Sequence, residues 1–267
     1  LRRPRARLSR TETRGKPYSC MGELLWYLAK SNDLKFITYY IKDYKDFSDD
    51  GKTIYGAYGP RLFNMDGNDQ VANVIRLLKK KPSSRQAVIQ LFKGTDILEE
   101  HKDIPCTCTL QFMIRENKMH MFVNMRSNDA YLGLPHDIFS FTMLQEILAR
   151  TLNVELGSYK HAAGSLHLYD RDKGKAQTYL DEGWQSTVSM PAMPKGDPWP
   201  SLVKLQQAEN DLRHGNEIQL TSTDLHPYWM DLVRLLQVYS YRKYKKWRKI
   251  AMIKKGMTSR IYDPYIR

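Results

Sequence analysis

Apolar residues along the chain gather into runs of two lengths. The longer runs predict helices over residues 21–28, 70–80 and 138–153. The shorter runs predict strands over residues 86–92, 107–114 and 118–125, with further strand-like runs over 158–169. Helices and strands are interleaved without strict alternation, and this order predicts an α+β fold.

Turn signals and proline divide the chain further. Asp49-Asp50-Gly51 and Glu116-Asn117 are typical of turns, and the glycine-rich stretch 55–63 predicts a loop that runs into a helix. We expect a core over residues 1–186, a proline-rich connection over 187–199 and a basic helical part over 200–267 that packs on the core.

The two ends of the chain carry expectations of their own. Residues 1–16 are basic and polar, which predicts a weakly constrained arm. Two helices are expected near the C-terminus, over residues 200–213 and 225–253. Asp224 is a candidate N-cap for the second, with Pro227 in its first turn.

Composition narrows the class of protein. With 267 residues and 42% hydrophobic content, the chain is long enough for one sizeable domain. No apolar run approaches the ~20 residues that a membrane helix needs, and no signal peptide is visible, so we expect a cytoplasmic protein. The three cysteines are too few for a disulfide framework, and the Cys106–Cys108 pair alone is too small for a zinc site. We therefore expect no metal and at least one free thiol.

Charge limits the partners. A net charge of +13 and a pI near 9.5 attract anions. Phosphorylated small molecules, polyglutamylated cofactors and nucleic acid all fit such a field.

Five short segments carry the candidate chemistry. They are GELLWYL at 22–28, SSRQ at 83–86, PC at 105–106, RSNDAYLGLPHDI at 126–138 and HLY at 167–169. With these motifs in this order, the chain resembles the thymidylate synthase family from about Arg10 to Asp170. The resemblance implies a large mixed sheet packed against helices, to which this chain adds C-terminal helices, and a homodimer that uses 5,10-methylenetetrahydrofolate.

The chemistry of the resemblance centres on Cys106. C5 of a pyrimidine is a poor nucleophile, but a thiolate added at C6 pushes electron density onto C5. By resemblance, Cys106 is that nucleophile, and Arg126 both binds the nucleotide phosphate and lowers the pKa of the thiol. The alternative is a small buried cysteine that only packs. We assign that role to Cys108, which is expected on the opposite face of the strand.

The resemblance also assigns the groups around the nucleotide. Ser127 would bind the same phosphate, and Arg85 would reach the phosphate of a dimer partner, although Gln86 stands where the family usually has a second arginine. His167 and Tyr169 would bind the sugar hydroxyl, with ordinary strand packing as their alternative.

Further positions would serve proton transfer and the folate. Glu23 would anchor a water network at the C4 side of the ring unless it is simply exposed, and Tyr58 would lie near the C5 proton. Asp129 would hold the pterin as a catalytic and cofactor-binding group. The cofactor would also lie against Leu132, Gly133 and Tyr44, and Gly133 would contact the substrate as well.

Asp137 bears on the choice of base. The family usually has asparagine there, whose amide matches the N3–H donor and O4 acceptor of uracil. An aspartate accepts from the N4 amine of cytosine and can share a proton with N3, whereas a carboxylate facing O4 of uracil is repelled. The substitution is that of the family's cytidylate hydroxymethylases. We therefore favour hydroxymethylation of CMP or dCMP, with a tolerated Asp137 as the alternative.

Two neighbouring substitutions concern the end of the reaction. Thymidylate synthases reduce the exocyclic methylene with hydride from the folate, whereas hydroxymethylases add water. Tyr44 and Phe47 stand about where the family has tryptophans beside the cofactor, and a smaller or more polar wall would admit water. His136 stands where the family usually has phenylalanine, next to Asp137, whose protonation it can tune.

Two other functions stay open. A thymidylate synthase acting on dUMP would reveal itself by producing dihydrofolate. A non-catalytic nucleotide or nucleic-acid binder is suggested by the basic run RKYKKWRK at 242–249, although we favour a solvated helix face as the explanation of this run.

Overall fold

A computed structural model describes residues 1–9, 17–185, 187–218 and 225–266. Its main sheet has four strands in the order β1-β2-β3-β5. These are β1 (Val88–Gln90), β2 (Thr107–Arg115), β3 (Lys118–Met125) and β5 (Glu155–Ala163). β1 and β3 both run antiparallel to β2, and β5 runs parallel to β3. A second, small parallel pair joins β4 (Asn128–Asp129) to β6 (Leu166–His167).

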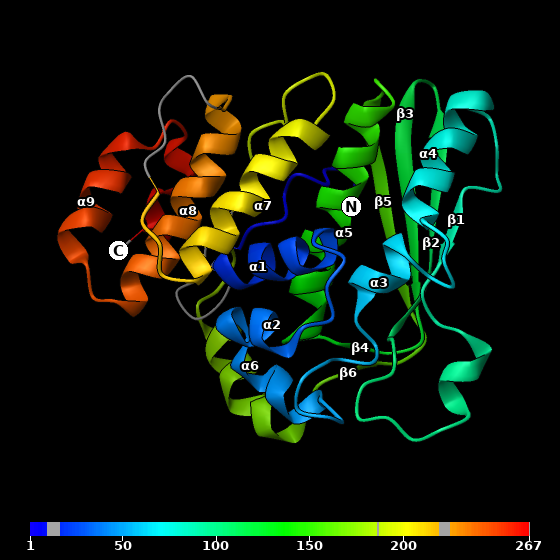
Figure 1. Ribbon diagram of the computed structural model, residues 1–267, viewed down its shortest axis with the longest axis horizontal. Coiled ribbons are helices and arrows are strands. Elements are labelled where there is room, and N and C mark those ends of the chain that lie inside the picture. Colours follow the sequence, from blue (N-terminus) through cyan, green and yellow to red (C-terminus); the bar gives the residue numbers. More distant parts are fainter. Residues whose placement is uncertain (10–16, 186, 219–224, 267) are drawn as a thin grey trace.

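Helices cover one side of this sheet in layers (Figure 1). The helices are α1 (Pro17–Leu28), α2 (Leu34–Tyr40), α3 (Tyr58–Phe63), α4 (Gln70–Lys80), α5 (Gly133–Thr151), α6 (Lys173–Asp181), α7 (Trp199–Arg213), α8 (Pro227–Lys243) and α9 (Trp247–Gly256), with 3-10 turns η1 (Lys42–Phe47), η2 (Gly94–Ile97), η3 (Asp170–Asp172) and η4 (Arg260–Tyr265). α5 packs on β3 and β5, α1 packs on α5, and α8 packs on α1, α7 and α9. The mixed sheet and its helical cover agree with the predicted α+β fold.

α5 is the centre of the core. Phe139, Met143 and Ile147 are all at most 1% exposed, and polar residues of the same helix are buried as well. A helix that is buried on every side cannot show a strong amphipathic pattern. The sequence correctly predicted a helix here, but placed its first residue at 138, whereas α5 begins at Gly133.

All the predicted strands fall on strands of the structure, but of the predicted run 86–92 only residues 88–90 form β1, and the run 158–169 spans the end of β5 and all of β6. β3 spans the predicted residues 118–125, and β2 differs from its prediction by one residue. Glu116 and Asn117 have φ of 50° and 56°, as a tight turn between right-twisted strands requires. α4 spans residues 70–80, as predicted.

The prediction of a weakly constrained N-terminal arm was wrong for residues 1–9, while residues 10–16 lie outside the described part of the chain. Arg5 and Arg7 each donate to a carboxylate oxygen of Glu146 at 2.6 Å, and Met193 N also donates to that carboxylate. Glu146 is buried within α5, so the arginines supply the charge that makes its burial tolerable. The two ion pairs fix the arm against the core helix.

The C-terminal segment differs from its prediction in one respect. The expected helix over 225–253 is two helices, because the chain turns at Lys245, whose φ is 56°. α9 then packs back on α8 through the buried Ile250. Asp224 lies outside the described residues, and the N-cap of α8 is His226, whose ring accepts from Tyr228 N.

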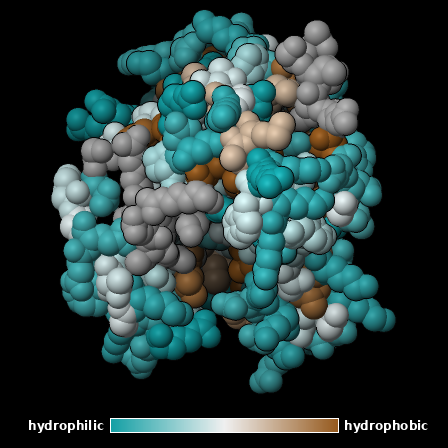
Figure 2. All heavy atoms as spheres, turned by 90° about the vertical axis from the view of Figure 1, so that its left-hand side faces the viewer, coloured by the Kyte–Doolittle hydropathy of each residue, from teal (hydrophilic) through white to brown (hydrophobic). Residues whose placement is uncertain are grey.

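The face formed by α8 and α9 is mostly hydrophilic (Figure 2). Tyr244 and Trp247 are 53% and 58% exposed there, while Lys246 and Lys249 pair with Glu217. Contacts such as the stacking of Tyr40 on Tyr239 join this part to the N-terminal helices. The division into a core and a C-terminal elaboration stays a prediction. None of the described helices is both long and apolar enough to span a membrane.

Candidate active site

Cys106 lies at the start of β2, directly beside Arg126 at the end of β3. The pairing of Thr107 with Met125 brings them together, and Arg126 N donates to Cys106 O at 2.8 Å. The Arg126 side chain then turns back along the other strand, where Nε donates to Pro105 O at 3.0 Å and Nη2 to Ile104 O at 2.8 Å. These bonds hold the exposed guanidinium against the segment that leads to Cys106, where its charge acts on the thiol.

The expected lowering of the pKa of Cys106 is not found in the structure. Burial raises the pKa of the thiol, Arg126 lowers it, and the nearby carboxyls of Asp137 and Asp103 raise it again. The balance lies above the ordinary value, because a single exposed arginine does not outweigh desolvation and two acids. Cys106 is therefore a thiol at neutral pH, and ionisation has to accompany its reaction.

Tyr58 places a hydroxyl beside the cysteine. Its oxygen accepts hydrogen bonds from Thr107 N at 3.1 Å and Thr107 Oγ1 at 3.0 Å. The ring stacks on Phe141 and lies 5.2 Å from the ring of Tyr27. Burial, with the charges of Asp137 and Cys106, raises the pKa of Tyr58 well above its ordinary value. The hydroxyl thus keeps its proton and can donate it toward a bound ring.

Glu23 is buried rather than exposed, at 5% of its surface. Its Oε1 accepts from Tyr44 Oη at 2.6 Å, and its Oε2 lies 2.8 Å from His136 Nδ1. Burial raises the pKa of Glu23, whereas His136 and the hydroxyls of Tyr44 and Tyr27 lower it. The lowering effects are the larger, so the pKa of Glu23 lies below its ordinary value. The carboxylate is thus held ionised inside the protein.

Asp137 is buried next to this network. It accepts from Asn128 Nδ2 at 2.7 Å through Oδ2. His161 fixes the amide of Asn128, because its Nε2 lies 3.0 Å from Asn128 Oδ1 and its Nδ1 lies 2.8 Å from Tyr159 Oη. Burial and the charge of Glu23 raise the pKa of Asp137 to about 8. At neutral pH its carboxyl is therefore largely protonated.

Gly133 leaves room at this point. A Cβ built there would lie 3.1 Å from Asn128 Nδ2 and 3.6 Å from Asp137 Oδ2. The first contact is tighter than most side chains tolerate, so glycine keeps the Asn128–Asp137 bond undisturbed.

Asp129 closes the turn before α5. Its Oδ1 accepts from Tyr131 N at 2.7 Å and from Leu132 N at 2.6 Å, and Leu132 is the residue that precedes the helix. Its Oδ2 is buried without a hydrogen-bond partner among the described residues. A buried, unpaired carboxylate oxygen is costly, and it is suited to a ligand that brings N–H donors.

The candidate phosphate and sugar groups lie along β4 and β6. Ser127 Oγ lies 3.4 Å from His167 Nδ1, and Asp129 pairs with His167 across the small sheet. The rings of His167 and Tyr169 meet edge to face at 4.9 Å, with Tyr169 49% exposed. Arg85 is exposed just before β1, and its guanidinium has no partner within the described part of this chain.

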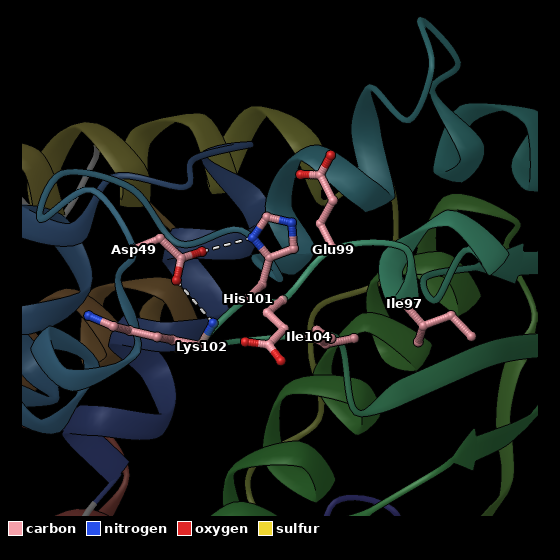
Figure 3. A pocket seen from close by; sticks show the side chains of 7 residues that line it. Asp49, Ile97, Glu99, His101, Lys102 and Ile104 are labelled. Atoms are coloured by element: carbon pink, nitrogen blue, oxygen red, sulfur yellow. Dashed lines mark hydrogen bonds and ion pairs between the residues drawn. The ribbon is translucent and has the colours of Figure 1, made fainter.

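A hollow of about 500 Å³ lies next to the segment that leads to Cys106 (Figure 3). Ile104 is among its lining residues, and Asp49 closes one side by binding His101 Nδ1 at 2.9 Å and Lys102 N at 3.0 Å. The ring of His101 stacks on Tyr55. Glu99 and Glu100 also line the hollow, so it has no clear preference for anions.

Two groups of the site escaped the sequence interpretation. Asn128 orients Asp137 through a hydrogen bond. The sequence could have indicated this role, because Asn128 lies within the longest motif, residues 126–138. Asp103 lies close to Cys106, and burial raises its pKa to about 6. Nothing in the local sequence distinguished Asp103 from a surface aspartate.

Known proteins give an independent comparison. Residues 10–197 match the family model described as thymidylate synthase. The chain is 34% identical to a deoxyuridylate hydroxymethyltransferase of Bacillus phage SP01 over 171 residues, which are 59% of this chain and 45% of the relative. It is 31% identical to a protein of the same name from Pseudomonas phage M6 over 173 residues, which are 64% of this chain and 49% of the relative.

A bacterial relative has another name. A thymidylate synthase of Francisella philomiragia is 28% identical over 167 residues, which are 57% of this chain and 61% of the relative. The chain thus matches about half the length of the phage relatives and less than two thirds of the bacterial one. The family model, in contrast, covers most of this chain and includes every predicted site residue. The chain therefore belongs to the thymidylate synthase family.

Proposed function

We propose that this protein transfers a one-carbon unit to C5 of a pyrimidine nucleoside monophosphate, and that it hydroxymethylates CMP or dCMP. The observation that supports the transfer most directly is Cys106 held beside Arg126, with the Tyr58 hydroxyl on the neighbouring residue. A protein that only binds nucleotides has no need of this thiol, so we favour an enzyme over a binding protein.

Binding of the nucleotide places C6 of the base at the thiol in this proposal. In the proposed complex, Arg126 and Ser127 hold the phosphate, and His167 and Tyr169 hold the sugar. Desolvation and the phosphate charge beside Arg126 do not favour a free thiolate, so the thiol loses its proton as Sγ bonds to C6. Sγ adds to C6, and the Tyr58 hydroxyl, which keeps its proton, is expected to lie near C5 and to hydrogen-bond the water that takes the C5 proton.

Asp137 reads the base in this proposal, with Asn128 holding one of its oxygens. With Oδ2 accepting from Asn128, a neutral Asp137 carries its proton on Oδ1. A carboxyl group has one donor and one acceptor and so matches cytosine, whose N3 accepts and whose N4 donates. The ionised form still accepts from N4. Cytosine is therefore compatible with both protonation states of Asp137.

The folate site is proposed from Asp129. Members of this family use 5,10-methylenetetrahydrofolate, which supplies the carbon at the oxidation level of formaldehyde. The unpaired Oδ2 of Asp129 fits the N–H donors of a pterin ring, and Leu132, whose N donates to Oδ1 of Asp129, and Gly133 follow closely in the chain. The hydroxyl of Tyr44 donates a hydrogen bond to Glu23, so we expect Tyr44 to contact the cofactor through the edge of its ring.

A uracil nucleotide is the second candidate substrate. Both phage relatives are named deoxyuridylate hydroxymethyltransferases, and a neutral Asp137 can donate to O4 and accept from N3–H. Thymidylate synthesis from dUMP is a third possibility. We also propose a homodimer in which the exposed Arg85 reaches the partner's phosphate.

Turnover of CMP, dCMP and dUMP with methylenetetrahydrofolate tests the proposal, with products identified by mass. We expect a hydroxymethylated cytosine nucleotide without dihydrofolate. Cys106→Ser is the matched control and should abolish turnover while nucleotide binding persists. Hydroxymethyl-dUMP as the main product would favour the second candidate, and thymidylate with dihydrofolate would favour the third.

A further inference from the structure

His136 links two helices through both of its ring nitrogens. It lies in the first turn of α5, where Nδ1 faces Glu23 Oε2 at 2.8 Å and Nε2 faces Ser19 Oγ at 3.2 Å. Ser19 and Glu23 are four residues apart and therefore share one face of α1. The His136 ring is 17% exposed, so its position is set by these two contacts and by packing.

The bonds around Glu23 favour its ionised form. Oε1 already accepts the short bond from Tyr44, which leaves Oε2 and His136 Nδ1 to share a proton. Burial lowers the pKa of His136, but the neighbouring Cys20 and Glu23 side chains raise it well above its ordinary value. An imidazolium donates from both nitrogens, and here both nitrogens meet oxygen atoms that can accept. His136 and Glu23 thus form a buried ion pair.

We propose that His136 is a positioning residue that keeps Glu23 ionised and aimed, so that Glu23 accepts the proton of the water that completes hydroxymethylation. This inference rests on the proposed function. In that step the water oxygen bonds to the exocyclic methylene carbon, and the methylene π pair forms the C5–C6 double bond. The C6–Sγ bond breaks, its electron pair returns to Cys106 as thiolate, and the water proton passes to Glu23. Reduction to a methyl group would need hydride and no such acceptor.

Other titratable groups among the described residues interact with this pair directly or through one another. They are Cys20 and Tyr27 of α1, Tyr44 of η1, Tyr58 of α3, Asp137 of α5, and Asp103 and Cys106 before β2. His136 is the one group in this set that carries a positive charge when protonated. Its removal should therefore affect Glu23 more than the loss of any of the others.

Two substitutions of His136 test the inference. His136→Phe removes the charge and both hydrogen bonds, and His136→Gln keeps a donor without the charge. We expect His136→Phe to lower kcat about 10²-fold, the usual scale of one acid–base contribution, with the nucleotide KM unchanged. The acid limb of the pH profile should move to higher pH, because the pKa of Glu23 rises when His136 is lost. His136→Gln should recover part of kcat, and His214→Phe at the exposed end of α7 is the control.

Separate outcomes distinguish the inference from the proposed function. An active wild type whose His136→Phe variant keeps the same kcat and the same acid limb would overturn the inference alone. Failure of the wild type to convert any nucleotide would overturn the proposed function, and with it the role in water addition. The effect of His136 on the pKa of Glu23 can be measured without substrate. The Glu23 carboxyl gives an infrared band that is identified by its loss in Glu23→Gln. If that band titrates alike in the wild type and in His136→Phe, the inference fails.

Discussion

Replacing Asp137 with asparagine should exchange the preferred base. In the variant, the new amide oxygen accepts from Asn128, as Asp137 Oδ2 does now. The new NH₂ group then points toward the base, where it can donate to O4 of uracil but meets the N4 amine of cytosine as a second donor. Asp137→Asn should therefore favour dUMP over dCMP and CMP.

The size of the exchange follows from the number of base atoms that lose a partner. Two positions change, N3 and the exocyclic group at C4, and each unpaired polar group costs about 1–3 kcal/mol. The total of about 2–6 kcal/mol corresponds to a change of about 30-fold to about 10⁴-fold in the ratio of kcat/KM, at about 1.4 kcal/mol per factor of ten. Because the pKa of Asp137 is near 8, the neutral acid of the wild type still tolerates uracil at pH 7. We therefore expect the lower end of this range at pH 7.

The assay is the ratio of kcat/KM for dCMP to that for dUMP, measured at pH 7 and pH 9 for both proteins. In the wild type the ratio should change through pH 8 as Asp137 ionises, because the carboxylate loses its donor to N3 of cytosine and to O4 of uracil but still accepts from N4 of cytosine and from N3–H of uracil. Ionisation of Cys106 is common to both substrates and cancels from the ratio. In Asp137→Asn the ratio should be smaller and flat with pH. A ratio that is unaffected by both the substitution and pH would refute the role of Asp137 as the base reader.

Three further predictions concern the nucleophile, the arm and the folate. The rate of Cys106 alkylation, followed by mass, should still increase above pH 9 because burial raises the pKa of the thiol. Arg126→Ala should move this pH profile to higher pH. A rate that is already constant near neutral pH would contradict a raised pKa for Cys106. Glu146→Gln should reduce the free energy of urea unfolding by about 3–5 kcal/mol, since it leaves the buried Arg7 and the partly exposed Arg5 without their anion. The arginines hold the pKa of Glu146 below its ordinary value despite its burial, so wild-type stability should be full at neutral pH and fall as acid protonates this carboxyl; equal stability of the two proteins at pH 7 would argue against the pairs. Asp129→Asn keeps the Oδ1 contacts before α5 but replaces Oδ2, the acceptor proposed for the folate. The KM for folate should therefore rise about tenfold, the equivalent of about 1.4 kcal/mol. An unchanged KM would exclude Asp129 from the folate site.

The sequence by itself determined much of the local structure and pointed to the candidate site. Alternation over 118–125 and the polar turn at Glu116-Asn117 depend on neighbouring residues alone, and the structure has both as predicted. The motif around Arg126 likewise indicated which residues would surround Cys106. These signals are short-range, so they can be seen without knowing how distant segments pack.

Tertiary structure decided the charge states and the partners. Glu23 is ionised because Tyr44 and His136 approach it from elements 21 and 113 residues away, and the thiol of Cys106 is neutral because burial and two acids outweigh Arg126. The arm is ordered because Arg5 and Arg7 meet Glu146 across about half the chain. The break at Lys245 lies in a stretch without glycine or proline, and packing of α9 on α8 offsets the strain of its positive φ. Desolvation and long-range pairing depend on what surrounds a residue in space, and the order of residues along the chain does not specify those surroundings.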